Sequence, residues 1–332
     1  METDMRKMLS LIAFAGMCCA APAVTRVGII GLDTSHSPNF AALLNGEKPL
    51  PEAKDFRVTV AYPWGSRTIK SSYERIPKYT EEVKKLGVEI VDSIPALLEK
   101  CDCVLLETND GRDHLAQALE VFKAGKPVFI DKPLAASLKD CVAIVEAGKK
   151  YNAKWFTASG LRYLTGVQAA RRGEYGKLRG IAMASPEKYE PTHSLFYWYA
   201  IHGAEPVFAA LGRGCETVCC LTSDDGDVII GKWADGKLSS QRALQADRKG
   251  ADSAYVGIIY TEQGPKDAGA REGYEPLVVR ILDFYRTGVA PIDPEETLEI
   301  FAYMEAAAES RAKGGAPVAL KDVLERAKEQ GK

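Results

Sequence analysis

The sequence predicts an α/β protein with two domains: a doubly wound parallel sheet, then an α+β domain whose open-faced sheet is mostly antiparallel. Three observations lead to this prediction. Strand-like apolar runs and helix-like amphipathic runs alternate six times between residues 25 and 150. After residue 158, alternating runs are joined by turns rich in glycine and aspartate. The 332 residues, 46% of them apolar, are enough for two cores.

Hydrophobic period and capping residues predict the elements of the first domain, residues 24–158. Strands are expected at residues 25–31, 57–61, 88–90, 101–107, 127–130 and 154–157. Helices are expected at residues 37–44, 79–86, 94–99, 113–124 and 137–150. Gly125 ends one of these helices at its C-cap, because glycine adopts the left-handed conformation required there.

The same criteria predict the second domain, residues 159–332. Strands are expected at residues 178–185, 216–223, 227–233, 238–244 and 253–260. Helices are expected at residues 165–173, 196–211, 273–287, 294–313 and 320–329. The last helices can pack back on the first domain, and the open sheet face predicts association into a homo-oligomer.

The N-terminus predicts a cleaved signal peptide over residues 1–23. Basic Arg6 and Lys7 precede an apolar run at residues 8–20, and small residues follow at 21–23. We therefore expect export to the periplasm or the medium, and a cytoplasmic protein if the leader is not processed. No segment is long enough for a transmembrane helix.

Charge and cysteine content exclude several classes of function. A formal net charge of −2 argues against nucleic acid as a partner. None of the eight cysteines is spaced as in a zinc cage, so free buried thiols and no metal site are predicted.

A strand, turn and helix at residues 25–44 predict a site for a dinucleotide pyrophosphate at a helix N-terminus. Gly31 fits the first glycine of the usual turn, but Asp33 and His36 replace the second and third. A carboxylate there disfavours a diphosphate unless it points away or accepts a hydrogen bond within the turn. Thr34 and Ser35 can supply hydroxyl and amide donors.

Two further strand ends carry polar residues. Ser66 and Arg67 follow the second strand, where they can hold a ribose 2′-phosphate or belong to a solvated loop. At the end of the fourth strand, Glu107, Thr108 and Asp110 suit contacts to a nicotinamide ribose, and Asp110 equally suits helix capping.

The fifth strand ends in Asp131-Lys132-Pro133, which places an ammonium group at the edge of the sheet where ligands bind. A solvated surface lysine is the alternative. Its position after a buried strand favours a functional role for Lys132.

The segment at residues 189–205 combines aromatic residues with two of the four histidines of the chain. His202 and Glu205 lie three residues apart, on one face of the expected helix. His202 is a candidate general acid/base, with His193 and Tyr199 as further candidates, whereas a histidine in the core is the alternative.

These motifs resemble the glucose–fructose oxidoreductase/inositol dehydrogenase (Gfo/Idh/MocA) family, from about residue 25 to the C-terminus. Asp131-Lys132-Pro133 is similar to its Glu-Lys-Pro element, and His114 to the histidine that closes its Thr-Pro-Asn-x-x-His element. Arg162 falls where the family often has arginine. His202 fits the histidine of its Asp-x-x-x-His helix, where Trp198 replaces the aspartate and Glu205, His193 or Tyr199 can substitute for it.

The resemblance implies an N-terminal Rossmann domain, an NAD or NADP cofactor and oxidation of a hydroxyl on a sugar or cyclitol. It implies that Lys132 polarises the hydroxyl while His202 handles its proton. The residues implied to bind the cofactor are Gly31, Thr34, Ser35, His36, Ser66, Arg67, Glu107, Thr108, Asp110, His114, Asp131, Lys132, Pro133 and Arg162. The alternatives are a glycoside-cleaving or epimerising enzyme that recycles tightly bound NAD, and a non-catalytic sugar- or nucleotide-binding relative.

Overall fold

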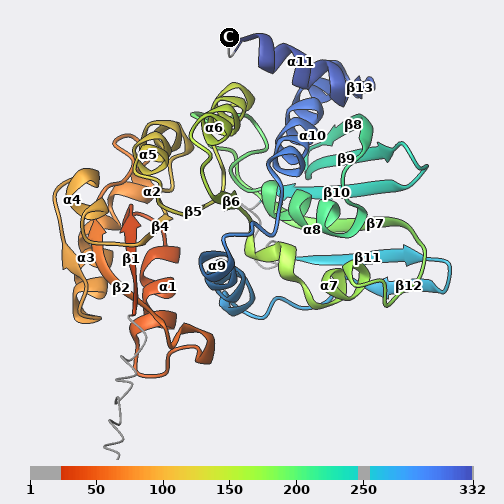
Figure 1. Ribbon diagram of the computed structural model, residues 1–332. Coiled ribbons are helices and arrows are strands. Elements are labelled where there is room, and N and C mark those ends of the chain that lie inside the picture. The colour runs from red at the N-terminus through yellow and green to blue at the C-terminus, as the bar shows by residue number, and fades with distance from the viewer. Residues whose placement is uncertain (1–23, 246–254, 331–332) are drawn as a thin grey trace, which may run out of the picture.

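The computed structural model describes residues 24–245 and 255–330, and it confirms the predicted fold class (Figure 1). The first sheet is parallel, with strand order β3-β2-β1-β4-β5-β6. Its strands are β1 (Thr25–Ile30), β2 (Phe56–Tyr62), β3 (Glu89–Ile90), β4 (Cys103–Leu106), β5 (Val128–Ile130) and β6 (Trp155–Thr157). The order reverses between β1 and β4, which places a crevice at the carboxyl edge of these two strands.

Helices cover both faces of this sheet because side chains alternate along its strands. On β1, Val27 and Ile29 pack against α1 (His36–Asn45), α3 (Ile76–Lys85) and α9 (Glu275–Thr287). Ile30 points to the other face, which is covered by α4 (Ile94–Leu98), α5 (Gly111–Lys123) and α6 (Leu138–Lys150). The short α2 (Lys70–Tyr73) and the 3-10 turn Pro51–Ala53 complete this part. A helix from the C-terminal part of the chain thus stabilises the first sheet.

The second sheet has the order β12-β11-β7-β10-β9-β8-β13. Its strands are β7 (Leu178–Glu187), β8 (Cys215–Ser223), β9 (Gly226–Trp233), β10 (Leu238–Gln245), β11 (Val256–Thr261), β12 (Gly264–Asp267) and β13 (Val318–Ala319). β7 and β10 are parallel, and the other pairs are antiparallel. The sequence did not predict β12 and β13, because each is short and lies at an edge.

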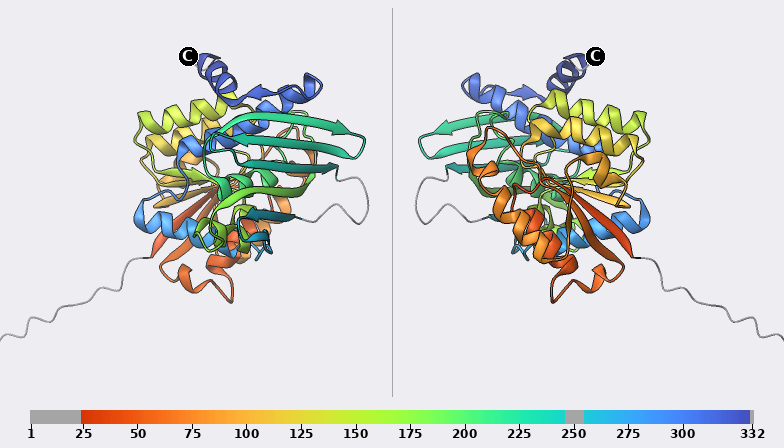
Figure 2. Two further views of the ribbon diagram at one scale, coloured as in Figure 1. Left: turned by 90° about the vertical axis from the view of Figure 1, so that its right-hand side faces the viewer. Right: turned by 90° about the vertical axis from the view of Figure 1, so that its left-hand side faces the viewer.

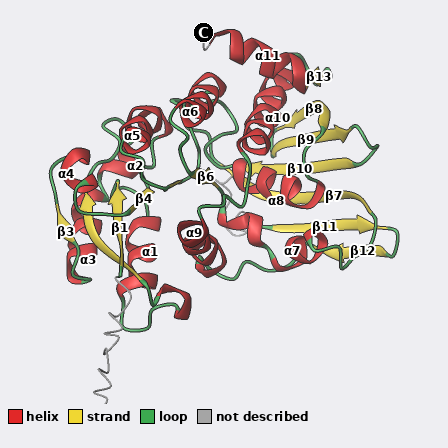
Figure 3. Ribbon diagram, viewed as in Figure 1, coloured by secondary structure: helices red, strands yellow, loops and turns green. Residues whose placement is uncertain are grey.

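Helices pack on one face of the second sheet, as the side view in Figure 2 and the helix and strand colours in Figure 3 show. α8 (Ile201–Leu211) contacts β7 and β10, and α10 (Pro294–Ala312) contacts β8. α10 and α11 (Leu320–Gln330) also contact α6 of the first domain. The other face exposes large apolar side chains: Leu221, Ile230, Leu238, Val256, Ile258 and Tyr260.

The connection between the domains runs through the 3-10 turn Gly160–Tyr163 and α7 (Thr165–Arg171). The helix expected at residues 196–211 begins only at Ile201, and most of residues 191–200 form turns. Phe196, Tyr197 and Trp198 are nevertheless buried, so their apolar character reflects core packing rather than a longer helix.

The predicted leader at residues 1–23 lies outside the described residues. Within the described part of the chain, no helix has the length and apolarity to cross a membrane. The prediction of free thiols is confirmed for Cys101, Cys103, Cys141, Cys215, Cys219 and Cys220.

Candidate active site

A cavity of about 200 Å³ lies at the carboxyl edge of the first sheet, between this edge and the second domain. Its wall combines the turn after β1, the ends of β4 and β5, and residues of the second domain. The lining residues are Thr34, Ser35, His36, Ser71, Arg75, Asn109, Lys132, Gly160, Leu161, Lys188, Trp198, Tyr199, His202, Tyr255, Arg271 and Tyr274. Arg75 and Ser71 were not predicted from the sequence, since they follow no recognisable motif.

The turn after β1 needs glycine at position 31. Gly31 has a φ of +95°, and a Cβ there would lie 2.4 Å from the backbone nitrogen of Thr108. The turn therefore packs directly on the end of β4. Ser35 at the N-cap of α1 makes no side-chain cap hydrogen bond. The amide of His36 makes only a long hydrogen bond to Thr34 Oγ1, at 3.5 Å, so the start of α1 can bind an anion at the cavity wall.

Asp33 points into the protein, away from the cavity. Its carboxylate accepts hydrogen bonds from the backbone amides of Ser66 and Asn109, each at 2.9 Å, and is fully buried. Burial raises the pKa of Asp33 to about 6, although these two hydrogen bonds lower it. Asp33 therefore ties together the loops after β1, β2 and β4, and does not oppose a diphosphate at the helix.

Asp33→Asn is expected to lower the free energy of unfolding by about 1–3 kcal/mol, because one of the two buried backbone amides then faces an NH₂ group and loses its acceptor. Denaturant unfolding measures this loss. Asp224→Asn, at an exposed turn position, is the matched control and should leave the stability unchanged. Equal stability of Asp33→Asn and the wild-type chain would contradict the role of Asp33.

Two residues predicted to hold a ribose phosphate do not line the cavity. Ser66 is buried, and its hydroxyl donates to Asp110 at 2.7 Å. Arg67 is exposed and lies over the ring of Trp64, 4.2 Å from its centroid. Asp110 caps α5 by accepting a hydrogen bond from the amide of Arg112 at 3.1 Å. Of the two roles that the sequence suggested for Asp110, the structure therefore supports helix capping.

Two histidines predicted at the site, His114 and His193, form hydrogen bonds with backbone groups instead. Both ring nitrogens of His114 lie within hydrogen-bonding distance of carbonyl oxygens, those of Leu134 (3.0 Å) and Thr108 (2.5 Å), and the side chain is fully buried. His193 Nε2 accepts from the amide of Gly111 at 3.1 Å. Burial lowers the pKa of His193 to about 4, so it is neutral. Neither histidine has a nitrogen free to contact a cofactor or a substrate.

Arg162 lies behind the cavity wall, in a buried ion cluster. It donates to Glu205 at 2.8 Å and also pairs with Glu296. Glu205 in turn accepts from the amide of Ser159 at 3.2 Å, and Ser159 Oγ lies 2.6 Å from His202 Nδ1. Arg162 therefore positions His202 through Glu205 and Ser159, and does not reach the cavity itself.

The structure brings Lys132, His202 and Tyr199 together in the cavity wall. The ammonium group of Lys132 makes no hydrogen bond or ion pair with another residue in the described ranges, and the peptide bond to the buried Pro133 is cis. Burial, together with the nearby charge of Lys132, lowers the pKa of His202 well below its usual value.

The ring of Tyr199 contacts the imidazole of His202 edge-on, and the two ring centroids lie 5.7 Å apart. Trp198 packs on His193 and supplies no carboxylate.

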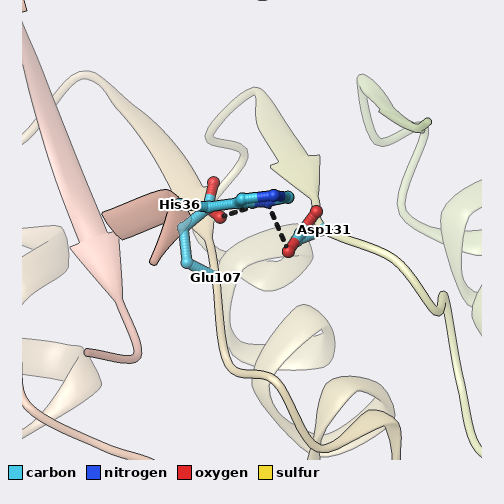
Figure 4. Close-up of side chains that lie close together, drawn as sticks. All are labelled: His36, Glu107 and Asp131. Carbon is cyan, nitrogen blue, oxygen red and sulfur yellow. Dashed lines mark ion pairs between the residues drawn. The ribbon is translucent and has the colours of Figure 1, made fainter. Parts of the chain in front are cut away.

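A cluster of His36, Glu107 and Asp131 adjoins the cavity (Figure 4). His36 Nδ1 lies 2.9 Å from Asp131 Oδ2 and 3.8 Å from Glu107 Oε2. Glu107 and Asp131 are fully buried; Asp131 pairs with His36, and neither carboxylate oxygen of Glu107 has a hydrogen-bond partner. Burial and the charge of Asp131 raise the pKa of Glu107 well above its usual value. Burial alone would raise the pKa of Asp131, but the charges of His36 and Lys132 outweigh it and lower that pKa.

These three residues were predicted to bind the cofactor, and their grouping into a cluster was not predicted. They follow three different strands, so no local spacing connects them, and only the parallel pairing of β1, β4 and β5 brings them together. Thr108 is also buried, and its hydroxyl has no hydrogen-bond partner.

The cavity fits a nicotinamide dinucleotide. The first turn of α1 offers amides without a side-chain cap, Asp33 is turned away, and Arg75, Lys132 and Arg271 supply positive charge along the wall. The cavity continues from this turn to Lys132 and His202, so one extended ligand can contact both. A parallel sheet with a cavity at the point where its strand order reverses is typical of nucleotide-binding α/β proteins.

Comparison with known proteins finds a family match in the first domain. Residues 25–159 match the family described as "Oxidoreductase family, NAD-binding Rossmann fold" (GFO_IDH_MocA). This part of the chain is similar to the family that the motifs predicted, and the match supports the prediction of a nicotinamide cofactor.

The individual relatives are distant. Inositol 2-dehydrogenase 3 of Saccharopolyspora erythraea is 30% identical over 128 residues, 37% of this chain and 32% of the relative. The match thus spans about a third of that relative's length. An oxidoreductase of Agrobacterium radiobacter, crystallised with NAD+, L-tartaric acid and magnesium, superposes with a TM-score of 0.69 at 17% identity, over 90% of this chain and 99% of that one. Scyllo-inositol dehydrogenase of Lactobacillus casei, crystallised with NAD(H) and scyllo-inositol, superposes with a TM-score of 0.69 at 14% identity. This superposition covers 90% of this chain and 99% of that one. Both structures show a shared fold.

Proposed function

We propose that the protein is an NAD(P)-dependent oxidoreductase that oxidises a hydroxyl group of a sugar or cyclitol. The observation that carries the proposal is the convergence of Lys132 and His202 in one cavity with the uncapped N-terminus of α1. Inositol dehydrogenases among the relatives and structural neighbours support this substrate class.

The residues that would hold the cofactor are the amides of residues 34–36, Asn109 and Arg75. The bound cofactor supplies a hydride acceptor. Tyr199, Tyr255 and Arg271 line the rest of the cavity and can donate hydrogen bonds to hydroxyl groups, while the tyrosine rings can pack against a sugar ring.

Lys132 and His202 divide the proton chemistry. The ammonium group of Lys132 binds the reacting oxygen and stabilises negative charge on it as its proton leaves. When Nδ1–H of His202 donates to Ser159 Oγ, the lone pair on Nε2 can accept this proton. His202 is ready to act as a base because its lowered pKa keeps the imidazole neutral at physiological pH.

Steady-state kinetics test the proposal. The full chain is assayed with NAD+ and NADP+ against a panel of cyclitols and aldoses, and reduced nicotinamide is measured by absorbance. Turnover of at least one polyhydroxylated substrate is expected. Binding of cofactor without turnover on any of them would favour the non-catalytic alternative, and a cofactor that copurifies and is recycled without net reduction would favour the epimerising or glycoside-cleaving one.

The pH dependence of kcat follows from His202. Since its pKa is lowered, the imidazole stays unprotonated through the usual titration range of histidine and gains a proton only in more acidic solution. We expect kcat to stay constant from neutral to mildly acidic pH and to fall below that range. In His202→Ala this acidic limb should disappear along with most of the activity, and an unchanged pH profile would contradict the role of His202.

Export and oligomerisation complete the proposal. We propose that residues 1–23 direct export, and that two chains associate through the open face of the second sheet, where Ile230, Val256 and Ile258 are exposed. Mass spectrometry of the mature N-terminus tests the first point and sedimentation equilibrium the second.

A further inference from the structure

We infer that His36, Glu107 and Asp131 form a binding site for one divalent transition-metal ion, with Zn²⁺ the best-matched cation. This site is independent of the oxidoreductase activity proposed above. Its donors come from the start of α1 and the ends of β4 and β5, so the fold itself positions them (Figure 4).

The described residues compensate the two buried carboxylates unequally. Glu107 and Asp131 are both fully buried; His36 pairs with Asp131 at 2.9 Å, whereas neither oxygen of Glu107 has a hydrogen-bond partner. Burying an unpaired carboxylate is costly unless a cation or several donors compensate it. An imidazolium at His36 could neutralise Asp131, but Glu107 would then still have no donor. A dication neutralises both carboxylates at once.

Two other charged groups face the cluster. Lys132 acts on both carboxylates at a distance, but it forms no ion pair with either in the described part of the chain. Asp33 adds negative charge near Glu107, although two backbone amides satisfy it. Neither Lys132 nor Asp33 contacts the carboxylate of Glu107 directly, so its oxygens are free to bind a cation in the described part of the chain.

The spacing of the donors suits zinc. Bonds of about 2.0–2.2 Å at tetrahedral angles separate two ligand atoms by about 3.4 Å. The observed separations from His36 Nδ1, 2.9 Å to Asp131 and 3.8 Å to Glu107, bracket this value. One imidazole with two carboxylates is a donor set for Zn²⁺ or a similar transition metal rather than for Mg²⁺ or Ca²⁺, which prefer oxygen alone.

The site adjoins the cavity because His36 is part of its wall. Only three His, Cys, Asp or Glu donors meet there among the described residues, which leaves at least one coordination position for water or for an oxygen of a bound ligand.

Zinc binding to the full chain tests the inference. After treatment with a chelator and its removal, the protein is titrated with Zn²⁺ alone, without any nicotinamide, and bound metal is measured by equilibrium dialysis. One Zn²⁺ per chain is expected for the wild type, together with a rise in Tm. Glu107→Gln should lose the bound Zn²⁺ and the rise in Tm. Glu187→Gln, a matched change at a buried glutamate on β7, should keep both.

X-ray absorption of the zinc-loaded wild type gives a second measurement that needs no variant to fold. A first shell of nitrogen and oxygen with one imidazole is expected. A shell that contains sulfur would assign the ion to a cysteine and overturn the inference. Failure of the wild type to bind Zn²⁺, or equal binding by Glu107→Gln and the wild type, would overturn it as well.

Discussion

Replacing Lys132 by methionine is expected to lower kcat for hydride transfer by about 10²–10⁴-fold. Methionine keeps much of the length of the side chain but removes the ammonium group that we propose to bind and polarise the reacting oxygen. Because the ammonium group of Lys132 makes no hydrogen bond within the described part of the chain, its loss should not disturb the fold. Stopped-flow kinetics with saturating cofactor separate the chemical step from cofactor binding.

The control for this variant is Lys139→Met, at an exposed position of α6. This variant should retain the wild-type kcat, since Lys139 is exposed to solvent and does not line the cavity. A Lys132→Met variant with the kcat of the wild type would show that the reacting hydroxyl lies elsewhere.

Arg162→Met is expected to lower the free energy of unfolding by about 3–5 kcal/mol, the largest stability effect among the changes considered. Arg162 is almost fully buried between Glu205 and Glu296, so its removal leaves two carboxylates close together without a counter-charge. Denaturant unfolding measures the loss. Arg172→Met breaks an exposed ion pair with Glu174 and should cost less than about 1 kcal/mol.

Arg162→Met should also lower the kcat of the folded protein, in addition to lowering the free energy of unfolding. Arg162 holds Glu205, which holds the amide of Ser159, whose hydroxyl contacts His202. Loosening Ser159 should therefore shift the acidic limb of the pH profile, a change that a purely structural residue would not cause. Wild-type stability in Arg162→Met would contradict the role of the buried cluster.

Local patterns were sufficient to predict most of the fold. The helix predicted at residues 294–313 is Pro294–Ala312, and the strand predicted at residues 227–233 is Gly226–Trp233. Such elements follow from hydrophobic period and caps, which act over neighbouring residues. The prediction that a helix begins at residue 196 was wrong, because the helix begins at Ile201. Aromatic residues are buried in turns as well as in helices, so their apolar character alone does not determine the backbone conformation.

The site was predictable only in part. Lys132 and His202 follow motifs, and the structure places both in one cavity. His114 and Arg162 match family positions too, but sequence could not reveal that carbonyl oxygens and carboxylates already occupy their polar atoms. The grouping of His36 with Glu107 and Asp131 depends on which strands pair, which is a tertiary property.

A crystal structure of the full chain with NAD+ or NADP+ tests the central claim most directly, namely that one cavity holds a nicotinamide cofactor against Lys132 and His202. We expect a diphosphate on the amides of residues 34–36 and a nicotinamide ring facing Lys132 and His202. A cofactor bound elsewhere, or a cavity left empty in crystals grown with saturating NAD+ and NADP+, would contradict it.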